Sequence, residues 1–141
     1  MVPHPEQEST FLPLTVAVTN SASADSGRVP AHTVRQRAEE AETVAAGCWV
    51  ALLGGCESPE LRALPGRLRA LAEATSIYVG TRWWCGHGAG YRRKVAETQL
   101  RINDAVREGD GAEFAEAFAG YDRAIATAVV SVPSTLESST P

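Results

Sequence analysis

One short stretch of the chain collects most of the residues that could take part in chemistry. Residues 81–94 read Thr-Arg-Trp-Trp-Cys-Gly-His-Gly-Ala-Gly-Tyr-Arg-Arg-Lys, and no acidic residue occurs between Glu73 and Glu97. The whole protein is acidic, with 13 Lys plus Arg against 17 Asp plus Glu, so this local group of cations and aromatic rings indicates a binding surface for an anion. The expected partner-binding residues are Arg82, Trp83, Trp84, His87, Tyr91, Arg92, Arg93 and Lys94.

The glycines of this stretch strengthen the same interpretation. Gly86, Gly88 and Gly90 precede a predicted helix, and the free N–H groups at the start of a helix favour an anion. Basic residues in that first turn oppose the helix dipole unless a negative charge compensates them. We therefore expect an anionic macromolecule, either a nucleic acid or an acidic protein surface, as the partner. The alternative is a loop whose tryptophans close the end of the fold and whose arginines are solvated.

Arg82 and His87 are separated by four residues. Over these six residues the chain resembles the arginine–histidine motif of the HEPN ribonucleases, which are helical bundles. The resemblance implies RNA cleavage at a dimer cleft, with Arg82 binding the scissile phosphate and His87 assisting proton transfer. The chain differs from that family in placing Trp83 and Trp84 directly after the arginine.

Three cysteines and a histidine offer an alternative metal site. Sulfur and imidazole are the ligands that structural zinc prefers, but such sites usually show pairs of ligands two to four residues apart. The chain lacks that spacing, and one of the cysteines falls on an apolar helix face, so we expect neither a metal nor a cofactor. The residues of this alternative are Cys48, Cys56, Cys85 and His87.

Apolar residues recur every three or four positions in four segments, which predicts four amphipathic helices. Gly54-Gly55 and Gly109 follow two of these segments and indicate helix ends. Pro65 predicts a turn and a kink, with the main part of the second helix starting there. Its end stays open, because residues 75–80 have weak helix propensity whereas an end at position 83 or 84 would match the length of the neighbouring helices. Pro133 predicts the end of the last helix. The predicted helices cover residues 33–53, 58–84, 91–108 and 110–132.

Short connections between these segments predict an all-α, single-domain, antiparallel four-helix bundle over residues 31–133. Residues 1–30 are expected to form an N-terminal arm and linker, and residues 134–141 a disordered tail. Within the arm, residues 11–20 alternate apolar and smaller side chains, which is compatible with an extended, strand-like arm or with a short helix. Both possibilities stay open.

Length and composition restrict the class of protein. The 141 residues suit one domain, and no run approaches the roughly 18 apolar residues of a membrane helix. The N-terminus does not read as a signal peptide, and three cysteines predict a reduced, cytoplasmic protein. We expect a non-enzymatic regulatory or adaptor protein, with a homodimer through an alanine-rich helix face as a possible assembly. The alternatives are a HEPN-like ribonuclease and a helical bundle that binds a small molecule under its tryptophans.

Overall fold

The computed structural model describes Thr15 and residues 29–139, with side chains at Thr15 and at residues 31–131. Within this part of the chain the regular structure is entirely helical, which confirms the all-α prediction. None of these helices is long and apolar enough to cross a membrane. The helices are α3 (Val29–Gly54), α4 (Pro59–Val79), α5 (Thr81–Cys85), α6 (Ala89–Glu108) and α7 (Gly111–Ser139).

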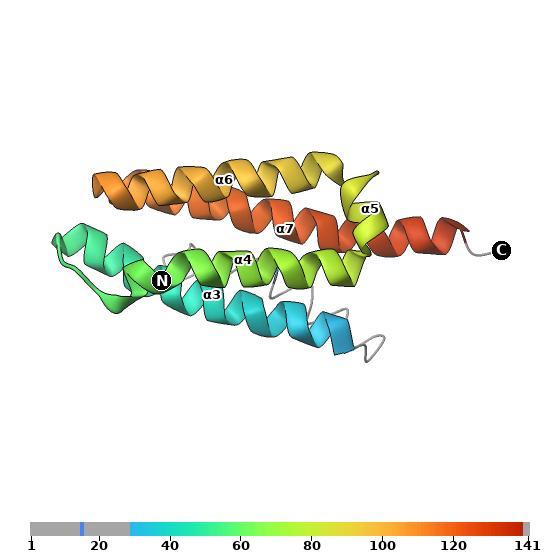
Figure 1. Ribbon diagram of the computed structural model, residues 1–141, viewed down its shortest axis with the longest axis horizontal. Coiled ribbons are helices and arrows are strands. Elements are labelled where there is room, and N and C mark those ends of the chain that lie inside the picture. Colours follow the sequence, from blue (N-terminus) through green and yellow to red (C-terminus); the bar gives the residue numbers. More distant parts are fainter. Residues whose placement is uncertain (1–14, 16–28, 140–141) are drawn as a thin grey trace, which may run out of the picture.

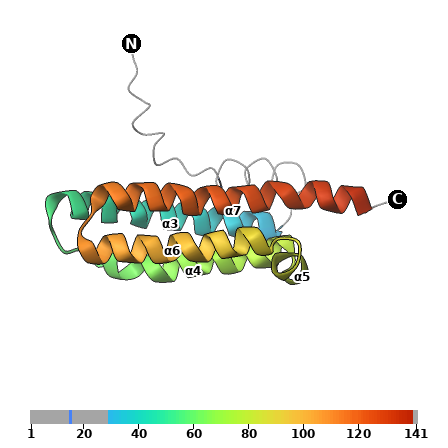
Figure 2. The ribbon, with the colours of Figure 1, turned by 90° about the horizontal axis from the view of Figure 1, so that it is seen from above.

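The four long helices form two helical hairpins that lie side by side (Figures 1 and 2). Helices α3 and α4 pack along each other, as do α6 and α7, and contacts between the two hairpins are fewer. The α3–α4 and α6–α7 connections lie at one end of the molecule, which we call the turn end. Helix α5 lies at the opposite end, which we call the elbow end.

Local side chains fix the starts of two helices. The Ser58 hydroxyl accepts a hydrogen bond from the backbone N–H of Leu61 at 3.4 Å, and Pro59 occupies the first turn of α4. Asp110 accepts the N–H of Glu113 at 3.0 Å and so caps α7. These caps position the helices that meet at the turn end.

Helix α4 is continuous through Pro65, so the prediction that the main helix starts at this proline is wrong. Proline has no N–H, and the carbonyl group four residues earlier, that of Leu61, therefore receives no hydrogen bond from position 65. The helix persists because Leu64 on one side of the proline and Leu68 on the other are both buried in the core. Burial of these side chains outweighs one missing main-chain bond.

The same helix ends at Val79, within the segment of weak helix propensity and before position 83 or 84. Gly80 has a φ of 94°, a conformation that L side chains rarely adopt, and it breaks the helix there. The chain then turns into the single-turn helix α5. The change of direction at Gly80 is what separates the tryptophans from α4.

The last helix extends further than predicted. Helix α7 passes through Pro133 and ends at Ser139, so residues 134–139 are helical where a disordered tail was predicted. A proline inside a helix removes one main-chain hydrogen bond but does not prevent a helix from continuing, with or without a kink. Residues 140–141 lie outside the described residues.

The predicted arm over residues 1–30 falls almost entirely outside the described residues, apart from Thr15 and the start of α3. Thr15 is helical and fully buried. Its backbone N–H lies 3.4 Å from Oδ1 of Asp122, and its hydroxyl lies 3.3 Å from the Asp122 carbonyl oxygen. This point of the N-terminal segment is therefore attached to α7.

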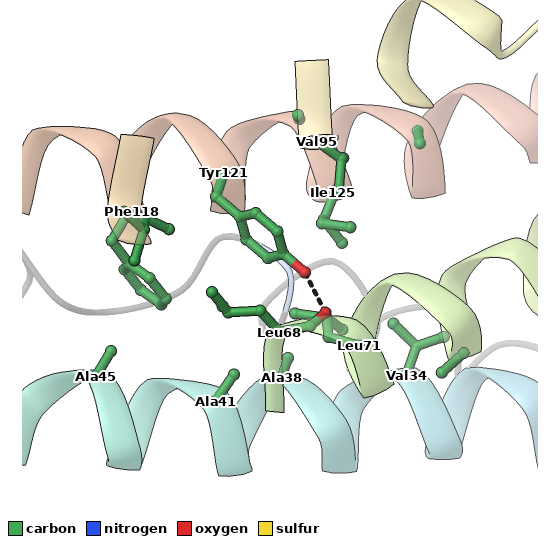
Figure 3. Packing of buried hydrophobic residues seen from close by; sticks show 14 of the residues in the cluster. Val34, Ala38, Ala41, Ala45, Leu68, Leu71, Val95, Phe118, Tyr121 and Ile125 are labelled. Carbon is green, nitrogen blue, oxygen red and sulfur yellow. Dashed lines mark hydrogen bonds between the residues drawn. The ribbon is translucent and has the colours of Figure 1, made fainter. Parts of the chain in front are cut away.

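The core lies between the two hairpins (Figure 3). Large side chains from α7 face a row of small ones on α3, and the Tyr121 hydroxyl donates a hydrogen bond to the Leu68 carbonyl of α4. Small residues let helices approach closely. The buried alanines of α3 thus pack within one chain. They are Ala31, Ala38, Ala41, Ala45 and Ala51.

Candidate functional site: a basic aromatic elbow

Residues 81–94 form a compact elbow that comprises α5, a three-residue turn and the first turns of α6. The N–H of Gly86 donates to the carbonyl groups of Arg82, at 2.9 Å, and Trp83, at 3.1 Å. The N–H of Gly88 donates to the Trp83 carbonyl at 2.7 Å, and that of Ala89 to the Gly86 carbonyl at 3.1 Å. These bonds fix the path of the chain between α5 and α6.

The glycines of the elbow serve packing more than anion binding, which changes the interpretation drawn from the sequence. A Cβ atom at position 88 would lie 2.5 Å from the ring of Trp83, far inside van der Waals contact. The Trp83 ring therefore lies directly against the backbone of Gly88. The N–H groups of Gly86 and Gly88, expected to face an anion, are used inside the turn.

The three aromatic residues of the elbow have different environments. Trp84 is 7% exposed and belongs to the core, so little of its surface is left for a partner. Trp83 is half-buried and stacks on Tyr91, with ring centroids 6.1 Å apart and an interplanar angle of 17°. The Tyr91 hydroxyl lies 3.4 Å from the Ser131 hydroxyl of α7. The Trp83–Tyr91 pair therefore forms the half-exposed aromatic rim of the elbow.

The four cations of the elbow lack negative partners among the described residues. Arg82, Arg93 and Lys94 are exposed and Arg92 is half-buried, and none of them forms an ion pair with a described carboxylate. The first turn of α6 contains no acidic residue. By contrast, several arginines elsewhere are paired, namely Arg35, Arg37, Arg67, Arg101 and Arg107.

Arg92 carries an additional feature. Its Nε atom is buried and has no hydrogen-bond partner among the described residues. A buried donor without an acceptor costs about 1–3 kcal/mol. The first turn of α6 therefore combines positive charge with a buried donor, the Arg92 Nε–H group, that has no acceptor among the described residues.

Arg82 and His87 are both exposed, as is the neighbouring Cys85. No hydrogen bond joins the side chains of Arg82 and His87 in the described part of the chain, and they lie on different local elements, α5 and the following turn. The arginine–histidine pair of the HEPN-like alternative therefore stays a prediction.

The four residues of the alternative metal site are not brought together. Cys48 and Cys56 lie toward the turn end and Cys85 and His87 at the elbow end, separated by the 21 residues of α4, which span about 30 Å. The described residues contain no group of three or more His, Cys, Asp or Glu side chains arranged to hold a metal ion. Burial raises the pKa of the Cys48 thiol to about 11, with a smaller contribution from the charge of Glu60. Cys48 is a core residue.

An electrostatic interaction between two acidic residues of α3 and α7 could not be predicted from the sequence. Asp122 of α7 is 7% exposed, and its negative charge acts on Glu42 of α3. Partial burial raises the pKa of Glu42, and the negative charges of Asp122 and Glu39 raise it further. The pair is invisible to helix periodicity because its members lie 80 positions apart in the chain.

In the described part of the chain, fold and site together define a helical structure with a basic elbow at one end of two packed hairpins, and the cations of this elbow form no ion pair with a described carboxylate. Comparison of the chain with protein-family models, curated proteins and solved structures finds no match.

Proposed function

We propose that this is a small, cytoplasmic, non-enzymatic regulatory or adaptor protein that binds an anionic macromolecule through the elbow. The two hairpins act in this proposal as an antiparallel four-helix bundle that holds the elbow rigidly at one end. The observation that carries the proposal is the cluster of four cations without a described negative partner, Arg82, Arg92, Arg93 and Lys94.

Single-stranded nucleic acid is the form of partner that the aromatic rim favours. Bases stack on exposed indole and phenol rings, and phosphates pair with the surrounding cations. Trp83 and Tyr91 provide half-exposed rings directly beside Arg92 and Arg93. An acidic protein surface would use the same charges but would gain less from the rings.

Salt dependence provides the first test. If four cations each neutralise one phosphate of a single strand, the logarithm of the affinity falls with the logarithm of salt concentration with a slope of about −2.8. An increase from 50 to 200 mM salt then weakens binding about 50-fold. Fluorescence anisotropy of a labelled single-stranded RNA 12-mer measures this slope, and a poly-glutamate peptide of equal charge provides the comparison with an acidic protein surface.

Two matched double variants assign the binding to the elbow. R92A/R93A is expected to reduce the slope to about −1.4. R62A/R69A removes the same charge from the exposed face of α4 and is expected to leave the slope unchanged. Equal effects of the two variants, or a slope near zero for both probes, would refute the proposal.

The same oligonucleotide separates binding from catalysis. Cleavage of the RNA that is lost in His87→Ala and kept in Cys85→Ala would replace the binding proposal with the HEPN-like ribonuclease. Binding without cleavage supports the adaptor.

A further inference from the structure

A second surface feature lies at the turn end, far from the elbow. Two adjoining hollows, with volumes of about 210 and 290 Å³, share Leu61 of α4 and Val106 and Arg107 of α6. We call them together the turn-end groove. For scale, a closed apolar cavity of about 150 Å³ accommodates benzene. The groove forms where the two hairpins meet, which is also where interhelix contacts are sparse.

The first hollow has mainly aliphatic walls, and the second combines aliphatic with polar residues. Leu64 and Pro65 line the first hollow, and Leu52 and Ala51 the second. Among the described residues, neither hollow has an aromatic lining residue, so a flat ring would find no stacking partner there. A flexible alkyl chain matches this lining better.

The polar groups of the groove include several hydrogen-bond acceptors, beside the amide of Asn103, which can donate and accept, and the guanidinium group of Arg107. The Leu61 carbonyl receives no hydrogen bond from position 65, because proline has no N–H. Glu57 and Glu108 line the second hollow and are exposed, and neither forms an ion pair with a described residue. The one cation of the lining, Arg107, is already neutralised by Asp104.

We infer that the turn-end groove binds an aliphatic ammonium ion. The alkyl chain lies along Leu61, Leu64 and Val106, and the ammonium group donates to the Leu61 carbonyl and to the carboxylates of Glu57 and Glu108. The net charge of the lining selects a cation over an anion, and the aliphatic walls select an alkyl chain over a ring. This inference concerns a different surface from the elbow and does not depend on the elbow's function.

The exposed thiol of Cys56 makes the groove directly measurable, because it lines the second hollow beside Glu57. In a Cys85→Ser variant, Cys56 is the one exposed thiol, since Cys48 is buried. The rate of Cys56 alkylation by iodoacetamide at pH 8 then reports occupancy of the groove. The reverse variant, Cys56→Ser, reports alkylation of Cys85 at the other end of the molecule and controls for general effects of the probe.

Three probes with the same eight-carbon chain and different head groups test the selection. We expect n-octylammonium to protect Cys56 at a concentration about 2- to 10-fold lower than 1-octanol does, and octanoate to be the weakest of the three. Shortening the ammonium chain weakens protection by up to about fourfold per methylene. None of the probes should protect Cys85.

Variants identify the head-group site. E57Q/E108Q should reduce the preference for octylammonium over octanol toward unity. Pro65→Ala supplies an N–H for the Leu61 carbonyl and should reduce the same preference, whereas Pro59→Ala, in the first turn of α4, should not. Pro65 also provides part of the apolar wall, and a change in that wall affects octylammonium and octanol equally. The ratio of the two protecting concentrations therefore reports the effect on the head group alone.

Absence of Cys56 protection by octylammonium up to its solubility limit would overturn the inference. Equal protection by all three probes would also overturn it, because the groove would then be apolar without charge selection. Parallel alkylation of Cys48 would show that the probe unfolds the protein and would count against a specific site.

Discussion

Replacement of Gly88 by alanine is the sharpest test of the elbow geometry. Gly88 has backbone angles of φ −88° and ψ 9°, which residues other than glycine can also adopt, so an added methyl group causes no backbone strain and acts on the folded state through its contacts. The new Cβ would lie 2.5, 2.7 and 3.0 Å from three carbon atoms of the Trp83 ring. Ordinary carbon contacts lie at about 3.5–4.0 Å, and the ring must therefore move by roughly 1 Å.

The Trp83 ring has little freedom to move. Its own carbonyl accepts the N–H groups of Gly86 and Gly88, and the ring stacks on Tyr91. Overpacking of this kind costs about 1–3 kcal/mol, and loss of the stacked pair about 0.5–1.5 kcal/mol. Alanine also lowers the conformational entropy of the unfolded chain, which stabilises the protein by about 0.4–1 kcal/mol and offsets part of this loss. We expect G88A to lower the free energy of unfolding by about 1–3 kcal/mol and the Tm by about 3–9 °C.

Gly90 provides a matched control two residues away. A Cβ atom at position 90 meets no other atom within 4 Å, and alanine is the better helix former. G90A should therefore leave stability unchanged or raise it by up to about 1 kcal/mol. Urea unfolding followed by circular dichroism measures both variants. ¹⁹F NMR of the protein labelled with fluorotryptophan shows whether the Trp83 resonance shifts in G88A and stays in place in G90A.

A double-mutant cycle isolates the proposed clash. In a Trp83→Ala background the ring is absent, so G88A should no longer destabilise the protein. Equal destabilisation by G88A with and without the Trp83 ring would show that the contact between Gly88 and Trp83 does not exist in solution. Opposite signs for G88A and G90A in the parent protein would support it.

Three further predictions concern the core and the α3–α7 contact. The buried Cys48 thiol, with its pKa raised to about 11, should react with a disulfide reagent at pH 8 only after unfolding, so a thiol titration of the native protein finds two reactive groups and not three. Tyr121→Phe removes the hydroxyl bonded to the Leu68 carbonyl and should lower the free energy of unfolding by about 0.5–1.5 kcal/mol, measurable by urea denaturation. Glu42→Gln should stabilise the protein above about pH 5 and have little effect at pH 3. The reason is that burial and then Asp122 raise the pKa of Glu42 above its ordinary value of 4.5, so ionisation opposes folding only above that range.

The long helices and several of their ends follow from local sequence. Ser58 and Asp110 cap α4 and α7 through their own side chains, and Gly109 adopts the left-handed conformation at the end of α6. These signals act over three or four residues, so the sequence displays them directly. The two prolines show where local reasoning fails. Helices continue through Pro65 and Pro133. At Pro65, burial of Leu64 and Leu68 outweighs one missing bond.

The positive charge of the elbow could be predicted from the sequence, but the packing of its side chains could not. The basic residues around Arg92 stand out in the sequence because no carboxylate lies near them in the chain. By contrast, the different environments of Trp83 and Trp84 depend on the break at Gly80, which rotates α5 relative to α4. The electrostatic effect of Asp122 on Glu42 and the groove between Leu61 and Val106 both involve segments more than 40 positions apart in the chain. No local periodicity carries that information.

The concentration of close helix contacts within α3–α4 and within α6–α7 bears on how the chain acquires its structure. Neighbouring helices joined by short connections bring mostly nearby residues together, and such low contact order is associated with folding in microseconds to milliseconds. During synthesis, the N-terminal hairpin leaves the ribosome first, with its row of alanines still facing solvent. The small size of those side chains limits the apolar surface that is exposed during this interval. Phe114, Phe118 and Tyr121 of α7 bury this surface once they have been synthesised.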